Sequence, residues 1–249
     1  MIALSDMLAP ANVLAGRVIL VTGACGALGE AGTHACAKAG ATVVLLGRRV
    51  PKLNKLYDAL VASGAPTPAI YPLDMEGATP TDYAQMADAI NNECGRLDGV
   101  LHTAAAFKGL TSMASTTPED WVRGLHVNVT APQLLTQACL PLLGNASDSA
   151  VVFALNDVAA TSRAYWGAYG VAQQALRGLI AVLADELSAG PIRIHGLQPG
   201  PMRTALRARA WSAEDASQWP PATVYAQACV WLLSEAARPQ HGRVIEVRA

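Results

Sequence analysis

Short apolar runs alternate with segments of helical periodicity along nearly the whole chain. The runs predict strands that are buried on both faces, at residues 17–22, 42–46, 69–73, 100–103, 150–155, 192–197 and 244–247. The segments between them predict helices at 28–39, 51–63, 80–94, 118–143, 167–189 and 223–237, with Pro132 kinking or splitting the fourth. This alternation predicts a doubly wound α/β fold. We expect one domain over residues 1–249, with a mostly parallel seven-stranded sheet between helices.

One segment departs from this rhythm. Residues 201–221 follow the end of a predicted strand and have an uneven composition. They form either a lid over a pocket or a static surface excursion. Trp211 and Trp219 lie in this segment. They either line a substrate pocket or only pack the loop.

Composition and charge narrow the function classes. Of the 249 residues 52% are hydrophobic and 15% charged, which predicts a large core. A net charge of −1 argues against nucleic acid, and the apolar runs are too short to span a membrane. No basic residue precedes Arg17, so no signal peptide is expected. The five cysteines form no C-x-x-C motif, which favours the cytoplasm, and no cluster has metal-ligand spacing.

A glycine-rich turn follows the first predicted strand. Residues 22–29 read TGACGALG and lead into a segment of helical composition. Glycines at 23, 26 and 29 allow a tight turn and a close approach to a pyrophosphate, which the N–H groups of the helix start would face. The alternative is a plain structural turn. Cys25, within the turn, is either a redox group or a small filler.

Two arginines, Arg48 and Arg49, follow the second predicted strand. In a dinucleotide-binding fold an acid at this point binds the ribose 2′-OH of NAD, whereas an arginine accommodates the 2′-phosphate of NADP. No acid is adjacent, and the planar guanidinium suits phosphate. NADP(H) is therefore the expected cofactor, with NAD(H) as the second choice. The alternative is a pair of solvated loop arginines.

Further motifs in a fixed order carry a resemblance to a known family. They are Leu73-Asp74, LDGVLH at 97–102, HVNV at 126–129, WGAY at 166–169, and Pro199-Gly200 with Thr204. Together with the glycine turn, they resemble the short-chain dehydrogenase/reductase family from about residue 17 to residue 247. The resemblance implies an NAD(P)-binding oxidoreductase.

The resemblance also implies roles for individual residues. Tyr169 would exchange a proton with the substrate oxygen, and Asn128 would hold a water in the proton relay. Asp74 would contact the adenine. Cofactor contacts are implied for Gly23, Cys25, Gly26, Leu28, Gly29, Arg48, Arg49, Asp74, Thr103, Ala104, Tyr169, Gln173, Pro199, Gly200 and Thr204.

The sequence departs from the family at two catalytic positions. Gln173 stands four residues after Tyr169, where the family has a lysine, and Asn156 stands thirteen before it in place of a serine. The lysine would lower the tyrosine pKa by about 2 to 3, which corresponds to ~3–4 kcal/mol. Glutamine can hydrogen-bond a ribose but brings no charge, whereas Asn156 can still donate an N–H to a carbonyl. Arg163 and Arg177 either supply positive charge near Tyr169 in place of the lysine or are solvated surface residues.

Two hypotheses of different classes follow. The first is an NADP(H)-dependent oxidoreductase on a carbonyl/alcohol pair, with Tyr169, Asn128, Asn156 and Gln173 in the catalytic positions, working slowly or at high pH. The second is a catalytically inactive NADP(H)-binding homologue that serves as a sensor or scaffold. A dehydratase or isomerase is a weaker third, because no second acid/base pair is visible. In the family, the helices matching 118–143 and 167–189 associate, so a homodimer or homotetramer is expected.

Overall fold

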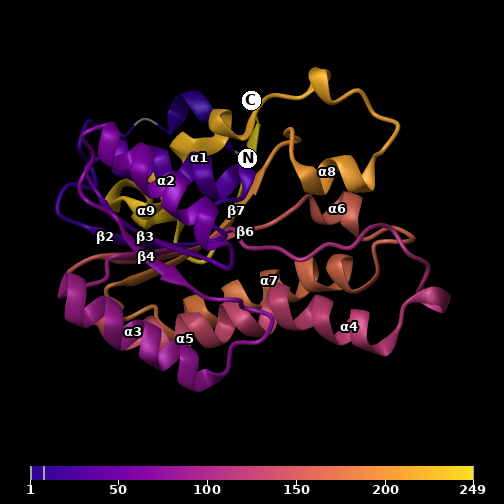
Figure 1. Ribbon diagram of the computed structural model, residues 1–249, viewed down its shortest axis with the longest axis horizontal. Helices are drawn as coiled ribbons and strands as arrows, with labels where there is room; N and C mark the ends of the chain where they lie inside the picture. The colour runs from indigo at the N-terminus through magenta and orange to yellow at the C-terminus, as the bar shows by residue number, and fades with distance from the viewer. Residues whose placement is uncertain (1, 8, 249) are drawn as a thin grey trace.

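The computed structural model describes residues 2–7 and 9–248, and its centre is a parallel sheet between two layers of helices (Figure 1). The strands are β1 Ile2–Ala3, β2 Val18–Thr22, β3 Thr42–Gly47, β4 Ala69–Pro72, β5 Gly99–His102, β6 Ser149–Ala154, β7 Ile192–Pro199 and β8 Val244–Arg248. In the described chain, these eight strands are ordered β1-β8-β7-β6-β5-β2-β3-β4. The parallel sheet with helices on both sides confirms the predicted fold class.

The α-helices cover both faces of the sheet. They are α1 Ala27–Lys38, α2 Val50–Ala62, α3 Pro80–Cys94, α4 Pro118–Leu125, α5 Ala131–Gly144, α6 Val158–Thr161, α7 Gly167–Glu186, α8 Ala205–Ala210 and α9 Ala226–Leu233. Figure 1 shows α1, α2 and α9 above the sheet and α3, α5 and α7 below it, while α6 and α8 lie beyond its right-hand end. Among the described helices, none is both long and apolar enough to cross a membrane.

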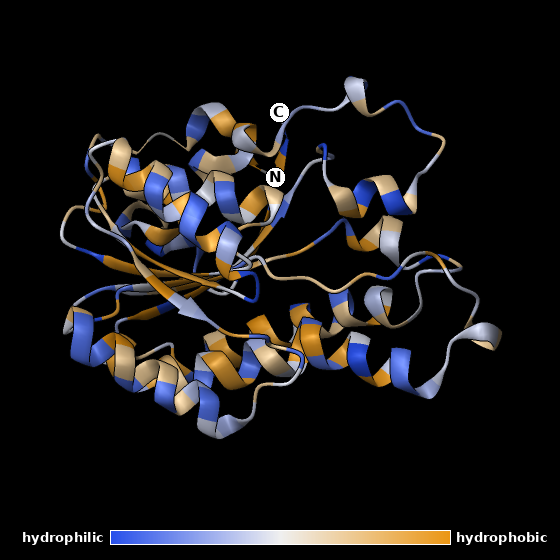
Figure 2. Cartoon of the chain, viewed as in Figure 1, coloured by the Kyte–Doolittle hydropathy of each residue, from blue (hydrophilic) through white to orange (hydrophobic). Residues whose placement is uncertain are grey.

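Successive residues of each central strand enter two different hydrophobic cores. In β2, Ile19 and Val21 pack in the core that includes α1, α2 and α9, whereas Val18 and Leu20 pack in the core of α3, α5 and α7. All five residues of β2 are buried. Figure 2 shows the orange strands between helices of mixed colour, as a sheet covered on both faces requires.

The predicted count of seven strands was wrong by one. β1 adds an eighth strand at the edge, where Ile2 pairs with Val247 and Ala3 with Arg248. A strand of two residues has no periodic pattern of its own. Its pairing depends on the opposite end of the chain, so local sequence could not predict it.

The helix predicted over 118–143 is split, as Pro132 indicated. α4 and α5 are separated by the π-helical turn η3, His126–Thr130. Pro132 has no N–H to donate to the carbonyl of Asn128 in an α-helical pattern, so the regular ladder cannot continue there. The helix predicted over 223–237 is likewise divided into the 3₁₀ turn η5 Ala222–Tyr225, then α9, then η6 Glu235–Gln240.

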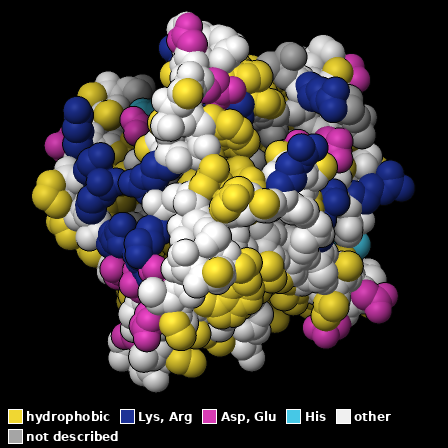
Figure 3. All heavy atoms as spheres, turned by 90° about the vertical axis from the view of Figure 1, so that its right-hand side faces the viewer, with side chains coloured by type: hydrophobic (Ala, Val, Ile, Leu, Met, Phe, Trp, Pro, Cys, Tyr) yellow, Lys and Arg dark blue, Asp and Glu magenta, His cyan; other side chains and the backbone are white. Residues whose placement is uncertain are grey.

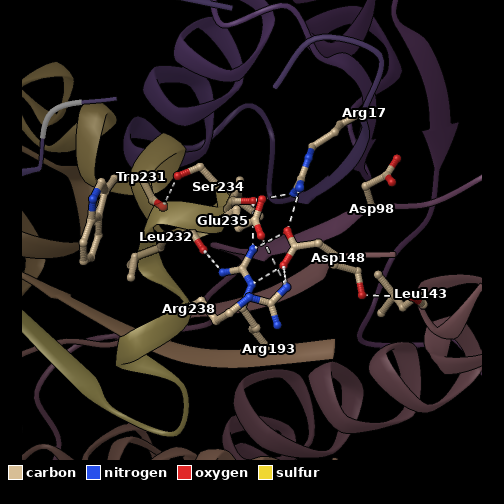
Figure 4. A network of polar contacts seen from close by, with 12 residues as sticks. Arg17, Asp98, Leu143, Asp148, Arg193, Trp231, Leu232, Ser234, Glu235 and Arg238 are labelled. Atoms are coloured by element: carbon tan, nitrogen blue, oxygen red, sulfur yellow. Dashed lines mark hydrogen bonds and ion pairs between the residues drawn. The ribbon is translucent and has the colours of Figure 1, made fainter. Parts of the chain in front are cut away.

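A buried charge network ties together the starts of several strands (Figure 4). Asp148 precedes β6, and its carboxylate accepts from Arg17 at 2.6 Å, from Arg193 at 2.8 and 2.9 Å, and from Arg238 at 2.8 Å. Arg17 and Arg193 also donate to the carbonyl of Leu233 at the end of α9. The network therefore joins β2, β6 and β7 to α9 at the edge of the sheet where these strands begin.

Candidate functional site

A cleft of about 930 Å³ lies at the opposite edge of the sheet, where the strands end. It opens where β2 meets β5, which is the point at which the strand order reverses. The ends of these strands are fastened together: the hydroxyl of Thr103 donates to the carbonyl of Thr22 at 2.6 Å, and the hydroxyl of Thr22 accepts from the Thr103 N–H at 3.2 Å. In doubly wound sheets, this point of reversal is where ligands bind.

The glycine turn forms one wall of the cleft. Gly23 has a φ of +65°, and a Cβ there would lie 2.8 Å from the backbone of Ala104. Gly26 is the N-cap of α1, and no side chain in the part of the chain that the structure describes caps this helix. The N–H groups of its first turn are therefore available to an anion. Gly29 does not line the cleft but lies behind the turn, where a Cβ would collide with the carbonyl of Gly23.

The arginines after β3 lie in the same cleft. Arg49 is the N-cap residue of α2, and Nη1 of Arg48 lies 3.8 Å from Oδ2 of Asp74, which follows β4. Both partners of this ion pair are more than half exposed, so the pair contributes little to stability. Sequence reasoning placed Arg48 and Asp74 in the site separately. The structure makes them neighbours.

Asn128 holds the loop that follows β5. Its Oδ1 accepts from the N–H of Ala106 at 2.9 Å, and its Nδ2 donates to the carbonyls of Ala106 and Gly124 at 2.9 and 2.7 Å. Both amide hydrogens are therefore engaged with backbone. The side chain of Asn128 therefore holds this loop and has no N–H left to donate to a relay water.

Tyr169, Asn156 and Gln173 converge between β6 and α7. Nδ2 of Asn156 lies 3.5 Å from the hydroxyl of Tyr169, and the N–H of Asn156 donates to Oε1 of Gln173 at 2.8 Å. Gln173 is 3% exposed and lines the cleft one helical turn beyond Tyr169. Because its oxygen is held by Asn156, its NH₂ group is left to face a ligand.

The environment of Tyr169 does not favour its ionised form. Burial raises the pKa of its phenol to about 12, and the hydrogen bond with Asn156 opposes this only in part. Neither Arg163 nor Arg177 contributes to the shift, so the positive charge considered from the sequence is not supplied by them. Tyr169 is therefore protonated across the ordinary pH range.

A buried histidine, His102, also borders the cleft. His102 stacks on Phe153 with ring centroids 4.7 Å apart, and its Nε2 lies 2.9 Å from the hydroxyl of Thr136. Burial lowers the pKa of His102 to about 3, so the ring is neutral. Its Nδ1 has no hydrogen-bond partner among the described residues, and the sequence offered no sign of this.

The far end of the cleft is lined by the aromatic residues Phe107, Tyr169 and Trp211. The rings of Phe107 and the buried Trp166 lie 5.1 and 5.8 Å from that of Tyr169, and Trp211 lies 5.3 Å from Trp166. Figure 3 looks onto the end of the molecule that carries α4 and α8, where hydrophobic side chains gather along the middle and basic side chains flank them. Sequence reasoning missed Phe107, whose only signal was an aromatic residue shortly after a strand end.

The first half of the segment 201–221 lines this end of the cleft. The segment carries α8, and its ends meet in a bridge between Arg203 and Pro221. Trp211 lines the cleft, as one of the two sequence interpretations held. Both rings pack on the guanidinium of Arg207, which lies 4.4 and 4.3 Å from their centroids, but Trp219 does not line the cleft. The tryptophans thus have different roles.

Comparison with known proteins identifies the fold family. A profile described as short chain dehydrogenase matches residues 17–215. The chain belongs to the short-chain dehydrogenase family. The expectation drawn from the ordered motifs is confirmed, and the protein is an oxidoreductase of Rossmann type.

Relatives of this short-chain dehydrogenase cover nearly all of its length. It is 34% identical over 237 residues to the uncharacterized oxidoreductase YciK of Escherichia coli K12, covering 95% of this chain and 94% of that protein. A structure from Pseudomonas syringae matches with a TM-score of 0.92 and 37% identity, covering 97% of each chain. A structure from Shigella flexneri 2a, complexed with NADP, matches with a TM-score of 0.91 and 34% identity, covering 95% and 99%.

Most of the predicted site residues meet in the one cleft. Those that line it are Gly23, Cys25, Gly26, Leu28, Arg48, Arg49, Asp74, Thr103, Ala104, Asn128, Asn156, Tyr169, Gln173, Pro199, Gly200 and Thr204. Only Gly29, among the predicted residues, lies outside this lining. The cleft of this short-chain dehydrogenase thus joins the glycine turn to a buried tyrosine.

Proposed function

We propose that this short-chain dehydrogenase uses NADP(H) to interconvert a carbonyl compound and its alcohol. The observation that carries the proposal is that one cleft holds the glycine turn, Arg48 and Arg49 at one end and Tyr169 with Asn156 at the other. The NADP complex of the related Shigella flexneri structure supports the choice of cofactor.

The residues present fit this cofactor. The start of α1, which no side chain of the described residues caps, offers N–H groups to a pyrophosphate, and the glycine at position 23 lets the turn approach the backbone of Ala104 closely. Arg48 and Arg49 suit a 2′-phosphate, and the NH₂ group of Gln173 suits a ribose hydroxyl. When bound, the reduced cofactor supplies the hydride that the carbonyl carbon receives.

The protein's own groups act on the carbonyl oxygen. The hydroxyl of Tyr169 donates its proton to this oxygen, and an N–H of Asn156 donates a hydrogen bond that polarises the carbonyl. The raised pKa of Tyr169 keeps the phenol protonated, which suits the direction of reduction. It also makes the phenol a weak acid at neutral pH, so the reaction is slow.

The alternative is an inactive homologue that binds NADP(H) as a sensor or scaffold. The observation that favours it is the buried neutral Gln173, which is held by the backbone of Asn156 and brings no charge to Tyr169. Both proposals require cofactor binding, so they differ only in turnover. Slow reduction of simple aldehydes by the wild-type protein distinguishes them.

Replacement of Arg48 or of Arg49 by alanine is expected to weaken NADPH binding roughly 10-fold or more and NADH binding little. A hydrogen bond between charged groups contributes about 1.5–3 kcal/mol, and only NADPH carries the 2′-phosphate. Calorimetric titration with both nucleotides measures this. Arg163→Ala is the matched control, because Arg163 is exposed and does not line the cleft. Equal weakening of both nucleotides would refute the 2′-phosphate assignment.

We also propose a homodimer or homotetramer built on α4 and α7. Val122 on α4 is 64% exposed, and Val171 and Val182 on α7 are 45% and 55% exposed, which leaves apolar side chains facing solvent on these helices. Light scattering should report at least twice the chain mass, and Val182→Glu should lower it; an unchanged mass would contradict this interface.

The five free cysteines support a cytoplasmic location.

A further inference from the structure

The basic side chains that line the cleft are not equally engaged. Those side chains are Arg48, Arg49, Lys108, Arg123, Arg207 and Arg209. Lys108 lies 2.6 Å from Asp120, Arg123 lies 2.8 Å from Glu76, Arg207 lies 2.6 Å from Glu214, and Arg48 lies 3.8 Å from Asp74. Among the described residues, no carboxylate lies within ion-pair distance of Arg49 or Arg209. One unneutralised arginine therefore lies at each end of the cleft.

Arg49 has an assignment in the proposed function, but Arg209 has none. Arg209 lies on α8, and its Nη1 donates to the carbonyl of Phe107 at 3.0 Å. This bond fixes the guanidinium beside the loop after β5 and uses one of its five N–H groups. The remaining donors can bind two oxygens of one carboxylate, which is the geometry that guanidinium groups favour.

Phe107 connects Arg209 to Tyr169, the proton donor of the proposed reaction. The ring of Phe107, whose carbonyl holds Arg209, lies 5.1 Å from the ring of Tyr169. Phe107 and Trp211 form an apolar wall along this end of the cleft, and Trp166 packs against both rings without lining the cleft. A substrate oxygen at Tyr169 and an acid group at Arg209 would therefore lie at two ends of an aromatic wall.

The neighbouring Arg207 differs from Arg209, because its guanidinium is already engaged within the segment. Arg207 is two residues from Arg209 on the same helix, but Glu214 pairs with it through two bonds of 2.6 and 2.7 Å. Its guanidinium also lies between Trp211 and Trp219, 4.4 and 4.3 Å from their ring centroids. The contacts of Arg207 thus stabilise the segment itself, whereas Arg209 keeps donors for a ligand.

We propose that Arg209 selects substrates that carry a carboxylate, so that the preferred substrate is an oxo acid with a ring-sized apolar body between its carbonyl and its acid group. This inference rests on the proposed reductase function, which it deepens by naming the substrate class. The apolar body would pack on Phe107 and Trp211, and the acid would pair with the guanidinium.

The test compares two probes, para-formylbenzoate and its methyl ester, in which the charge of the acid group is present or masked by a methyl group. With NADPH present, the wild-type protein should reduce the acid with a kcat/KM roughly 10-fold or more above that of the ester. Arg209→Gln should abolish this preference chiefly through a higher KM for the acid, leaving the ester unaffected. Because the guanidinium is exposed, the preference should also shrink at about 1 M salt.

Arg203→Gln is the matched control. Arg203 lies in the same segment and is exposed, but it does not line the cleft, so the preference for the acid should survive. Equal use of both probes by the wild-type protein would overturn the inference, as would a preference that Arg209→Gln leaves intact.

Binding separates this inference from the proposed function. Calorimetric titration of the NADPH-bound protein with benzoate and with methyl benzoate needs no turnover. If neither aldehyde is reduced but benzoate binds and Arg209→Gln loses it, the reductase proposal fails and the acid site stands. If the aldehydes are reduced without any preference for the acid, the reductase stands and the acid site fails.

Discussion

Replacing Gln173 by lysine and Asn156 by serine in one protein is expected to raise the kcat of carbonyl reduction about 100-fold, within the range for general acid catalysis. A lysine ammonium one turn beyond Tyr169 would stabilise the phenolate, which burial now disfavours, and so make the phenol a stronger acid. A simple aldehyde with saturating NADPH provides the assay.

The pH dependence of alcohol oxidation gives a second measure of the same change. Oxidation requires the phenolate of Tyr169, and with a pKa of about 12 the rate should rise with pH across the whole alkaline range. With lysine at position 173, the rise should occur about 2 to 3 pH units lower. The profile of kcat/KM against pH measures the displacement.

Gln174→Lys is the matched control for this pair. Gln174 is the next residue of α7, is exposed, and donates to the hydroxyl of Ser162 at 2.9 Å, so a charge there should leave the rate unchanged. If the double variant binds NADPH normally and gains no activity, the loss of lysine is not the cause of slow turnover. That result would favour the inactive, cofactor-binding homologue.

Asp148→Asn is expected to lower the free energy of unfolding by about 3–5 kcal/mol, because breaking a buried charge network leaves uncompensated charge. Asp148 is 7% exposed and receives hydrogen bonds from Arg17, Arg193 and Arg238 (Figure 4). An amide is neutral and has only one oxygen, so it could not accept from all three arginines or balance their charge. Urea denaturation followed by circular dichroism measures the change.

The acid dependence of stability should change in the same variant. Burial alone would raise the pKa of Asp148, but hydrogen bonds from Arg193 and Arg17 outweigh it and the net pKa is lowered. Stability from this group is present above the ordinary aspartate pKa of about 3.9 and is lost as the pH falls toward the lowered value. Asp148→Asn should lack this part of the acid dependence.

Glu235→Gln serves as the control for Asp148. Glu235 lies 3.9 Å from Arg238 but is 72% exposed, so its removal should change stability by less than about 1 kcal/mol. If the two variants are equally stable, the network does not stabilise the fold in the manner described.

Local sequence signals determined those elements whose ends are chemically marked. The helix predicted at 80–94 is α3 with the same limits. Thr79 and Asp82 form a capping box at its start, Pro80 occupies its first turn, and Gly95 ends it with a φ of +71°. These signals act within a few residues of one another, so they are visible without tertiary structure.

The sequence by itself also determined the parallel sheet, because strands buried on both faces are apolar at successive positions. The tertiary structure alone decided the arrangement of the site. It placed Asp74 beside Arg48, formed the hydrogen bond from the N–H of Ala106 to Oδ1 of Asn128, and raised the pKa of Tyr169 through burial.

The same reason explains the strand that was missed and the arginine that was not foreseen. β1 exists only through pairing with β8, and Arg209 gains its meaning only from its bond to the carbonyl of Phe107. Periodicity and caps report on neighbours along the chain. A contact between segments a hundred or more residues apart depends on packing that no local pattern encodes.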